Sequence, residues 1–269
     1  MRTTRARGRG AVLAVLSVLV LAGCGGAEIQ VSGTAPGERI EAYEAMAGVA
    51  LGQVEDLWGE DAVARPVEVV LPGSAAEFAE LTGGAPASQE APAVTVGSLD
   101  EAHVVVHPDS WDRLTPEGRQ AVLTHEVTHL SMQGDGGVPG WLGEGLAEYT
   151  AHRTSDLAPA AIAGSALDPV RAGQVPTDWP DLGSAPVAPG PVGAAGDGAD
   201  EPAEGSTWGG YALAWLACLY LADTWSEEQL VELYEVVAGG STLTDAVPQV
   251  LGVSEAEALA GWGEWLTTL

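Results

Sequence analysis

The feature of the sequence that most constrains the fold is the run His-Glu-Val-Thr-His at residues 125–129. On a helix, residues four positions apart lie on one face, so His125 and His129 can bind a single metal ion. Glu126 then projects beside them and is placed to act on a water molecule at the metal. We therefore expect these residues to be helical and to carry a metal site.

A metal held by two histidines needs a third protein ligand and an open position for water. The pattern with a third histidine fails, because Met132 and Asp135 stand where that pattern has its glycine and its histidine. The alternative is a carboxylate on a second helix, which we expect to run from about Trp141 to His152. Glu144, in the segment Trp-Leu-Gly-Glu-Gly-Leu-Ala-Glu-Tyr, supplies that carboxylate.

The run 125–129, followed by the segment Pro139–Tyr149, resembles the gluzincin zinc peptidases, and is most similar to their bacterial peptidase MA-like branch. The resemblance spans roughly residues 38–152 and the helices from Tyr211 onward. It implies an α+β zincin fold of the thermolysin-like type. In that fold a small mixed sheet and the metal-binding helix form a first lobe, and a helical C-terminal lobe closes a cleft over the metal.

The same resemblance implies roles for particular residues. His125, His129 and Glu144 become ligands of Zn²⁺, and Glu126 becomes the general base that takes a proton from the attacking water. In the family, an edge strand near the metal-binding helix pairs with extended substrate. The strand expected at Ala102–His107, just before the helix, is assigned this place.

The remaining site residues have two interpretations each. In relatives a tyrosine or histidine of the C-terminal lobe stabilises the oxyanion, and Tyr211 is placed like that tyrosine, but it could equally be a core aromatic residue. Tyr149 is a weaker candidate, since it is expected to pack beside the ligand helix. Glu148, one turn after Glu144, is either a solvated acid or an acceptor that fixes the tautomer of a ligand histidine.

Other chemically active residues are given structural roles. His103 and His107 share a strand face, where a second metal site is conceivable but cleft or surface histidines are favoured. His152 is expected to be a cation at a helix C-terminus, where the helix dipole favours it. Cys218 lies in the apolar run 211–221 and is expected to be a buried, inert thiol.

The N-terminus has the organisation of a bacterial secretion signal. Four arginines lie in the first ten positions, and the apolar stretch Ala11–Ala22 follows them. Residues 21–24 read Leu-Ala-Gly-Cys, which resembles the lipobox of lipoproteins; an ordinary signal peptide with a chance cysteine is the alternative. The resemblance implies that residues 1–23 are removed and that Cys24 is acylated. The expected location is the extracytoplasmic face of the cell membrane.

The strongly acidic composition limits the kinds of molecule that the protein can bind. The chain has a formal net charge of −28, and residues 1–23 carry four arginines and no acids, so the processed chain would carry six basic and 38 acidic residues, a charge of −32. Such a charge repels phosphates, which excludes nucleic acid and leaves acyl chains as the membrane anchor. Peptide or protein substrate is the expected partner, and the protein is expected to be a monomer.

The chain is expected to divide into a tether (24–37), a first lobe with the metal site (38–154), a flexible connection rich in Ala, Pro and Gly (155–207) and a helical lobe (208–269). Within the first lobe, apolar periodicity predicts a helix over 38–58 and a short helix over 74–81. Strands are predicted over 66–71, 93–96 and 102–107. Thr115 followed by Pro116 predicts the start of the metal-binding helix, which should run to about Met132.

The function that these observations favour is zinc-dependent hydrolysis of peptide bonds outside the cytoplasm. Aminopeptidase relatives carry a Gly-x-Met-Glu-Asn segment that binds the free amine of the substrate, and no such segment occurs here, so endopeptidase activity is expected. The alternative is a catalytically silent lipoprotein that serves as a binding or envelope-assembly module. The intact Glu126 argues against it, because a binding module has no need of a base beside its metal. A zinc-delivery lipoprotein would predict a histidine-rich tract, which the sequence lacks.

Overall fold

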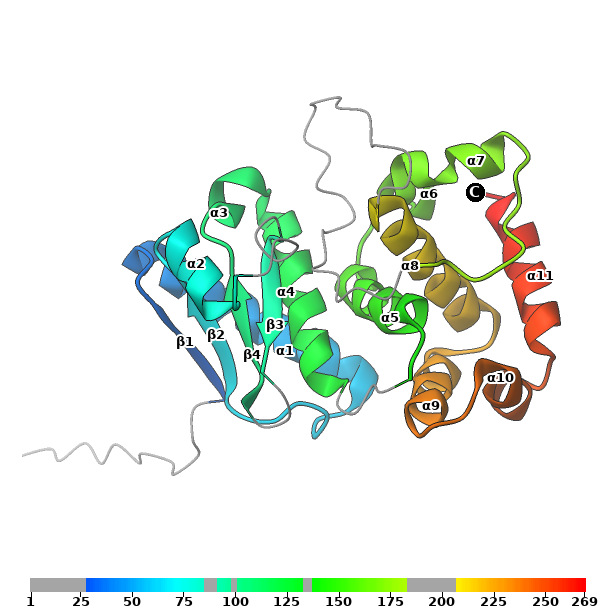
Figure 1. The fold of residues 1–269 in the computed structure, drawn as a ribbon, viewed down its shortest axis with the longest axis horizontal. Coiled ribbons are helices and arrows are strands. Elements are labelled where there is room, and N and C mark those ends of the chain that lie inside the picture. The colour runs from blue at the N-terminus through cyan, green and yellow to red at the C-terminus, as the bar shows by residue number, and fades with distance from the viewer. Residues whose placement is uncertain (1–27, 85–90, 98–100, 133–136, 183–206) are drawn as a thin grey trace, which may run out of the picture.

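The structure is a computed structural model that describes residues 28–84, 91–97, 101–132, 137–182 and 207–269. It is an α+β fold with one small mixed sheet and a large helical part (Figure 1). Along the chain its elements are β1 (Ile29–Gly33), α1 (Gly37–Trp58), β2 (Val67–Leu71), α2 (Ala75–Leu81), β3 (Ala93–Val96), β4 (His103–Val106), α3 (Ser110–Arg113), α4 (Pro116–Ser131), α5 (Gly140–His152), α6 (Pro159–Ala163), the 3₁₀ helix η3 (Gly164–Leu167), α7 (Asp168–Arg171), α8 (Thr207–Thr224), α9 (Glu227–Ala238), α10 (Leu243–Leu251) and α11 (Glu255–Leu266).

The sheet has the strand order β1-β2-β4-β3. β1, β2 and β4 are parallel, and β3 pairs antiparallel with β4. The strands predicted over 66–71, 93–96 and 102–107 are confirmed to within one residue at each end. The expectation that the strand at 102–107 lies at the edge of the sheet is wrong, however. This strand, β4, pairs with β2 on one side and with β3 on the other, so β3 is the edge strand.

The segment expected to be a tether, residues 24–37, contains the first strand. Ile29–Gly33 pairs in parallel with Val67–Leu71 along its whole length. Ile29 and Val31 alternate with polar residues, and their side chains pack against the core cluster under the sheet. Five residues with a partner more than 30 positions away give little local signal, which explains the miss.

The expected flexible connection at 155–207 is also wrong in its first half. Residues 159–171 form α6, η3 and α7, and the apolar side chains of this stretch pack on the helical core. Trp179 stacks between Trp141 and Trp262, with ring centroids 4.5 and 5.5 Å away. Burial of these side chains holds the backbone in place despite the many Ala, Gly and Pro residues. Residues 183–206 lie outside the described part of the chain.

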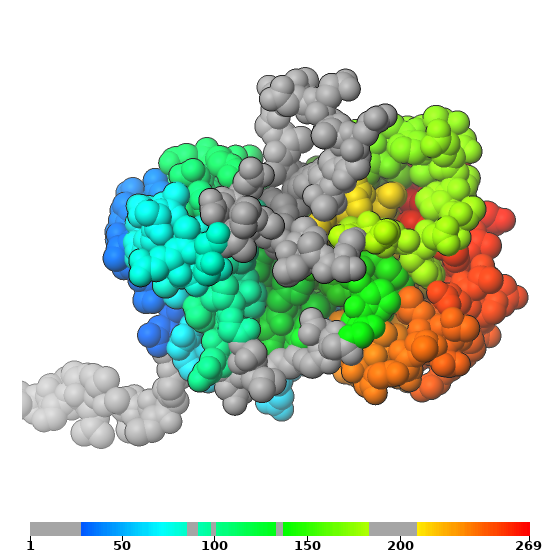
Figure 2. All heavy atoms as spheres, viewed as in Figure 1, coloured from blue at the N-terminus to red at the C-terminus, as the bar shows by residue number. Residues whose placement is uncertain are grey.

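The protein has two main hydrophobic cores, which divide the chain differently from the predicted lobes. One lies between the sheet, α1 and α4, and the other is formed by α5 and the helices that follow it. Figures 1 and 2 show the two halves side by side, with α4 and α5 between them. The predicted boundary after residue 154 does not coincide with the division between the two cores. The second core includes Met132 at the end of α4 and the buried side chains of α5, which pack mainly on α8.

The α5–α8 contact depends on one glycine. A methyl group at Gly145 would lie 2.5 Å from the carbonyl oxygen of Ala214 and 2.8 Å from Cys218 Sγ. The two helices thus approach more closely than any side chain at this position allows. Gly143, on the other side of Glu144, has no atom within 4 Å of such a methyl group.

We predict opposite effects for two matched substitutions in α5. Gly145→Ala should lower the free energy of unfolding by about 1–3 kcal/mol, because α5 must move away from α8. Gly143→Ala should raise it by about 0.5–1 kcal/mol, since alanine is the better helix former and has room here. Urea denaturation of both variants measures the difference. Equal stabilities would show that α5 and α8 are not in close contact at Gly145.

Candidate metal centre

The metal-binding helix predicted at 116–132 is α4, and most of its C-terminal half is buried, with His129 and Ser131 partly exposed. Thr115 caps it by accepting a hydrogen bond from Gly118 N, and Pro116 occupies its first turn. Val122, Leu123 and Val127 pack into the core under the sheet, while the opposite side of α4 contacts α5. This packing holds the two histidines of the helix at the seam between the two cores.

Three side chains meet at this seam. The Nε2 atoms of His125 and His129 are 3.1 Å apart, and Glu144 Oε2 lies 3.3 Å from the first and 3.4 Å from the second. Glu144 Oε2 is buried and has no hydrogen-bond partner. Among the described residues, these three form the group of ligand atoms close enough to hold a metal ion. The first core supplies the histidines, and α5 of the second core supplies the carboxylate.

The close contacts within the group favour the charged forms of His125 and Glu144. Burial lowers the pKa of His125, but its contacts with Glu144 and Glu148 outweigh burial and raise the pKa to about 10. Burial raises the pKa of Glu144, and here the charge of His129 and the contacts with both histidines prevail and lower it to about 2. Glu144 is therefore ionised at neutral pH. Its Oε2 lies close to the Nε2 atoms of both histidines, so the three atoms could bind one cation.

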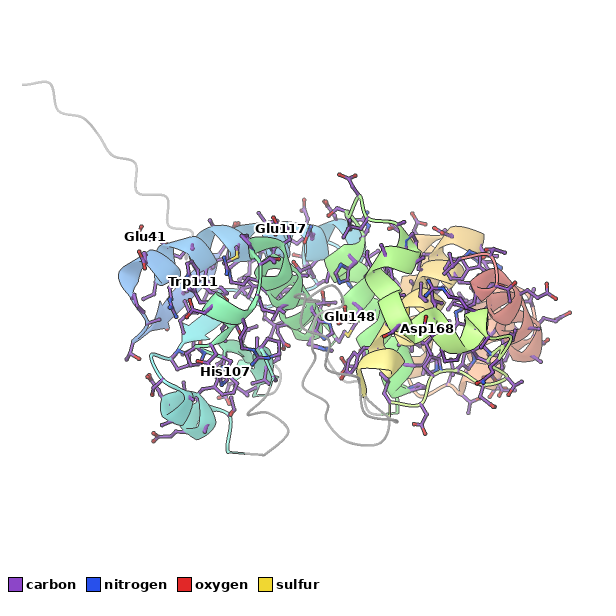
Figure 3. All side chains as sticks on the ribbon, turned by 90° about the horizontal axis from the view of Figure 1, so that it is seen from above. Glu41, His107, Trp111, Glu117, Glu148 and Asp168 are labelled. Carbon is purple, nitrogen blue, oxygen red and sulfur yellow. The ribbon has the colours of Figure 1, made fainter. Side chains whose placement is uncertain are left out.

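Glu148 is buried beside His125, so its interpretation as a solvated helix acid is wrong. Its Oε1 lies 3.2 Å from His125 Nδ1, on the far side of the ring from Glu144. Figure 3 shows Glu148 between the sheet half of the molecule and the helices of the second core. Burial raises the pKa of this carboxyl, but the contacts with His125 and His152 lower the pKa by more than burial raises it. The carboxyl therefore stays ionised. The contact with His125 is an ion pair without hydrogen-bond geometry, and it places a negative charge behind the His125 ring.

His152 extends this chain of contacts, which its predicted role as a terminal cation did not include. Its Nε2 lies 3.5 Å from Glu148 Oε2, and its ring packs edge-on against Trp215 of α8. The i, i+4 spacing of Glu144, Glu148 and His152 was visible in the sequence and places all three on one face of α5. What the spacing could not show is that this face is buried.

Glu126 lies beside the metal group without belonging to it. Thr95 of β3 donates a hydrogen bond to Glu126 Oε2 at 2.7 Å, while Oε1 is buried and has no hydrogen-bond partner. Burial raises the pKa of Glu126, and the neighbouring charges of His125 and His129 act against that shift. Sequence analysis missed Thr95, because nothing local connects it to a helix 31 residues away.

Tyr211 and Tyr149, the two candidate oxyanion donors, lie in different surroundings. Tyr211 of α8 is buried, and its pKa is raised first by burial and then by the charges of Glu144, Glu148 and Glu126. It is thus a protonated phenol in the field of the site's carboxylates. The hydroxyl of Tyr149 instead donates a hydrogen bond to Oε1 of Glu227, the first residue of α9, at 2.8 Å. Arg153 donates to the same oxygen.

The other singled-out residues lie outside the metal group. The Nδ1 atom of His107 accepts a hydrogen bond from Asp109 N, and its ring packs against Phe78. His103 Nδ1 lies 3.2 Å from the carbonyl oxygen of Glu101. Cys218 is fully buried in α8, and burial raises the pKa of its thiol, as expected of an inert core cysteine. Cys24 lies outside the described residues.

Comparison of the chain with protein-family models, with curated proteins and with solved structures finds no match. Within the described ranges, no helix combines the length and the apolar character needed to cross a membrane.

We predict that the purified protein binds one divalent metal ion per chain, and that Glu144→Ala abolishes this binding. Glu117→Ala, which removes an exposed carboxylate from the start of α4, is the matched control and should bind normally. Glu148→Ala should bind about 10–100-fold more weakly, because the His125 ring loses its orienting partner. Affinity should rise with pH from neutral to mildly alkaline conditions, since metal binding must displace the proton on His125.

Calorimetric titration of the metal-free protein measures both stoichiometry and affinity. Full binding by Glu144→Ala would remove Glu144 from the ligand set.

Proposed function

We propose that this protein is a zinc-dependent endopeptidase with a zincin fold. The observation that carries the proposal is a single juxtaposition at the seam between the two cores. A three-atom ligand group, with one carboxylate and two imidazoles, lies beside the buried carboxylate of Glu126, which has one oxygen held by Thr95 and the other free of hydrogen bonds. A base next to a metal group is the arrangement that metal-assisted hydrolysis needs.

The donor set supports zinc in particular. Zinc in catalytic sites takes three protein ligands, commonly two histidines and a carboxylate, and leaves a fourth position for water. Ligand atoms at tetrahedral positions around zinc lie about 3.3 Å apart. The separations of the three donor atoms here are 3.1, 3.3 and 3.4 Å. The carboxylate of Glu148 behind His125 adds the orienting contact that zinc-bound histidines commonly have.

The arrangement of elements supports the zincin assignment. A small sheet ends in an antiparallel edge strand, β3, which contacts the helix that carries the histidines. The third ligand comes from the next helix, which belongs to the helical second half. The resemblance to gluzincin peptidases implies this same order of sheet, metal-binding helix and ligand helix. The edge strand that would pair with substrate is Ala93–Val96, however, and not the strand at 102–107.

The proposed mechanism assigns one task to each side chain. His125, His129 and Glu144 would hold the ion, which acidifies water and polarises the scissile carbonyl group. Glu126 takes the proton of the attacking water on its free Oε1 and delivers it to the leaving amine. Tyr211, kept protonated by burial and by the nearby carboxylates, donates a hydrogen bond to the oxyanion.

Peptide substrate would bind along the outer edge of β3, where no strand of the described ranges pairs. His107 N donates to the carbonyl oxygen of Pro92, and the pairing alternates from there, so the main-chain groups of Val94 and Val96 face β4. Those of Ala93 and Thr95 therefore face the outer edge, where an extended peptide can add as a further strand. An internal stretch of chain fits such an edge, in keeping with endopeptidase activity.

The decisive experiment compares the wild type with Glu126→Gln. The amide keeps the size and shape of the side chain, so zinc content should stay near one ion per chain. Hydrolysis should fall by several orders of magnitude, because an amide cannot accept the proton of water at neutral pH. Single-turnover cleavage of a pool of internally quenched peptides, with zinc measured on the same samples, gives both values.

Tyr211→Phe belongs in the same assay as a second variant. Loss of one oxyanion donor should lower kcat by about 10²–10³ while zinc content and KM change little. A wild type that is as inactive as Glu126→Gln on every peptide would favour the silent binding module. A fully active Tyr211→Phe would leave the peptidase assignment intact and remove only Tyr211 from the mechanism.

We further propose that the protein is anchored by acyl chains on Cys24 at the extracytoplasmic face of the membrane. The support is the Leu-Ala-Gly-Cys sequence after the apolar stretch, and the start of the sheet only five residues later, at Ile29. Cells expressing the full chain should incorporate labelled palmitate into the wild type, and Cys24→Ser should abolish this labelling. An unlabelled wild type released into the medium would refute the anchor without affecting the peptidase proposal.

A further inference from the structure

Thr95 connects the edge strand to the proposed general base. Its hydroxyl lies 2.7 Å from Glu126 Oε2 and 3.0 Å from the carbonyl oxygen of the same residue. One hydroxyl hydrogen serves one acceptor at a time, and the carboxylate is the nearer and more basic of the two. The contact joins β3 to the metal-binding helix across 31 positions of sequence.

The two parts of Thr95 point in different directions. Its main-chain N–H and C=O face the outer edge of the sheet, away from β4, because Thr95 pairs with Val104 at a position where the two strands exchange no hydrogen bonds. Its side chain lies on the face of the sheet that packs on α4. A peptide added to this edge would bind the main chain of the residue whose hydroxyl holds Glu126.

The geometry points to Thr95 as a positioning residue that couples peptide binding at the β3 edge to the orientation of Glu126. Its hydroxyl holds Oε2 and thereby directs the other oxygen, Oε1, toward the reacting water. Main-chain hydrogen bonds from an extended peptide fix Thr95 and, through it, the carboxylate. This inference rests on the proposed peptidase function and adds a residue that the three ligands, the base and the oxyanion donor do not include.

The test uses two variants, one that removes the hydroxyl of Thr95 and one that keeps it. Thr95→Val keeps the branched shape and the β-strand preference of the residue but cannot donate a hydrogen bond. Thr95→Ser keeps the hydroxyl and loses a methyl group. Full-length protein with its zinc content measured is assayed on pairs of quenched peptides with the same scissile bond, one short and one extended along the β3 edge.

In the wild type, extension of the peptide should raise kcat as well as lower KM, because binding at the edge orients the base. Thr95→Val should lower kcat on the extended peptide about 10- to 100-fold, the size of effect that a misplaced catalytic group produces. It should still show the drop in KM, since its main chain is unchanged. Thr95→Ser should retain most of the wild-type kcat and the gain with peptide length.

Two further measurements separate positioning from a general structural role. Zinc content should be the same in all three proteins. In the Glu126→Gln background, where no cleavage occurs, Thr95→Val should leave the affinity for the extended peptide within about twofold. A loss of zinc, or equal losses of kcat in Thr95→Val and Thr95→Ser, would overturn the inference and leave a packing role.

The inference and the proposed function fail in different ways. An active wild type, inactive Glu126→Gln and unchanged kcat in Thr95→Val would overturn the role of Thr95 alone. A wild type no more active than Glu126→Gln would overturn both.

Discussion

The seam between the two hydrophobic cores is the constraint on which the rest of the structure depends. Along it, the carboxylates of Glu126 and Glu148 are fully buried and that of Glu144 is mostly buried, which is costly unless each is paired or hydrogen-bonded. The two histidines of α4 and the hydroxyl of Thr95 supply those partners. Neither core contains the whole set, so the charges are accommodated only when the two cores pack against each other.

Packing at a distance from the site determines where its ligands lie. The close approach of α5 to α8 at Gly145 sets the position of Glu144, which is the adjacent residue. On the other side, the core under the sheet holds α4, and β3 reaches Glu126 through Thr95. Small shifts in either half would change the three donor separations. The proposed chemistry therefore relies on residues that never touch substrate.

Much of the site could be predicted because its parts are local. His125, Glu126 and His129 share one helical turn, and Glu144 and Glu148 share another, so spacing alone places each set on a helix face. Thr95 could not be predicted in this way, since its contact with Glu126 depends on how β3 packs on α4. The same limit applied to β1 and to residues 159–171, whose order comes from burial against distant elements.

The sequence by itself determined the helices α1, α2, α4 and α5, three of the four strands and the residue types that can bind a metal, because periodicity, capping and spacing act over a few residues. Only the tertiary structure decided that the three candidate ligands lie between the two cores, that β3 is the edge strand among the described strands, and that His152 contacts Glu148 and Thr95 contacts Glu126. These features depend on which faces of the helices and of the sheet pack against one another. That is a property of the packed chain as a whole, because burial depends on contacts between segments far apart in sequence.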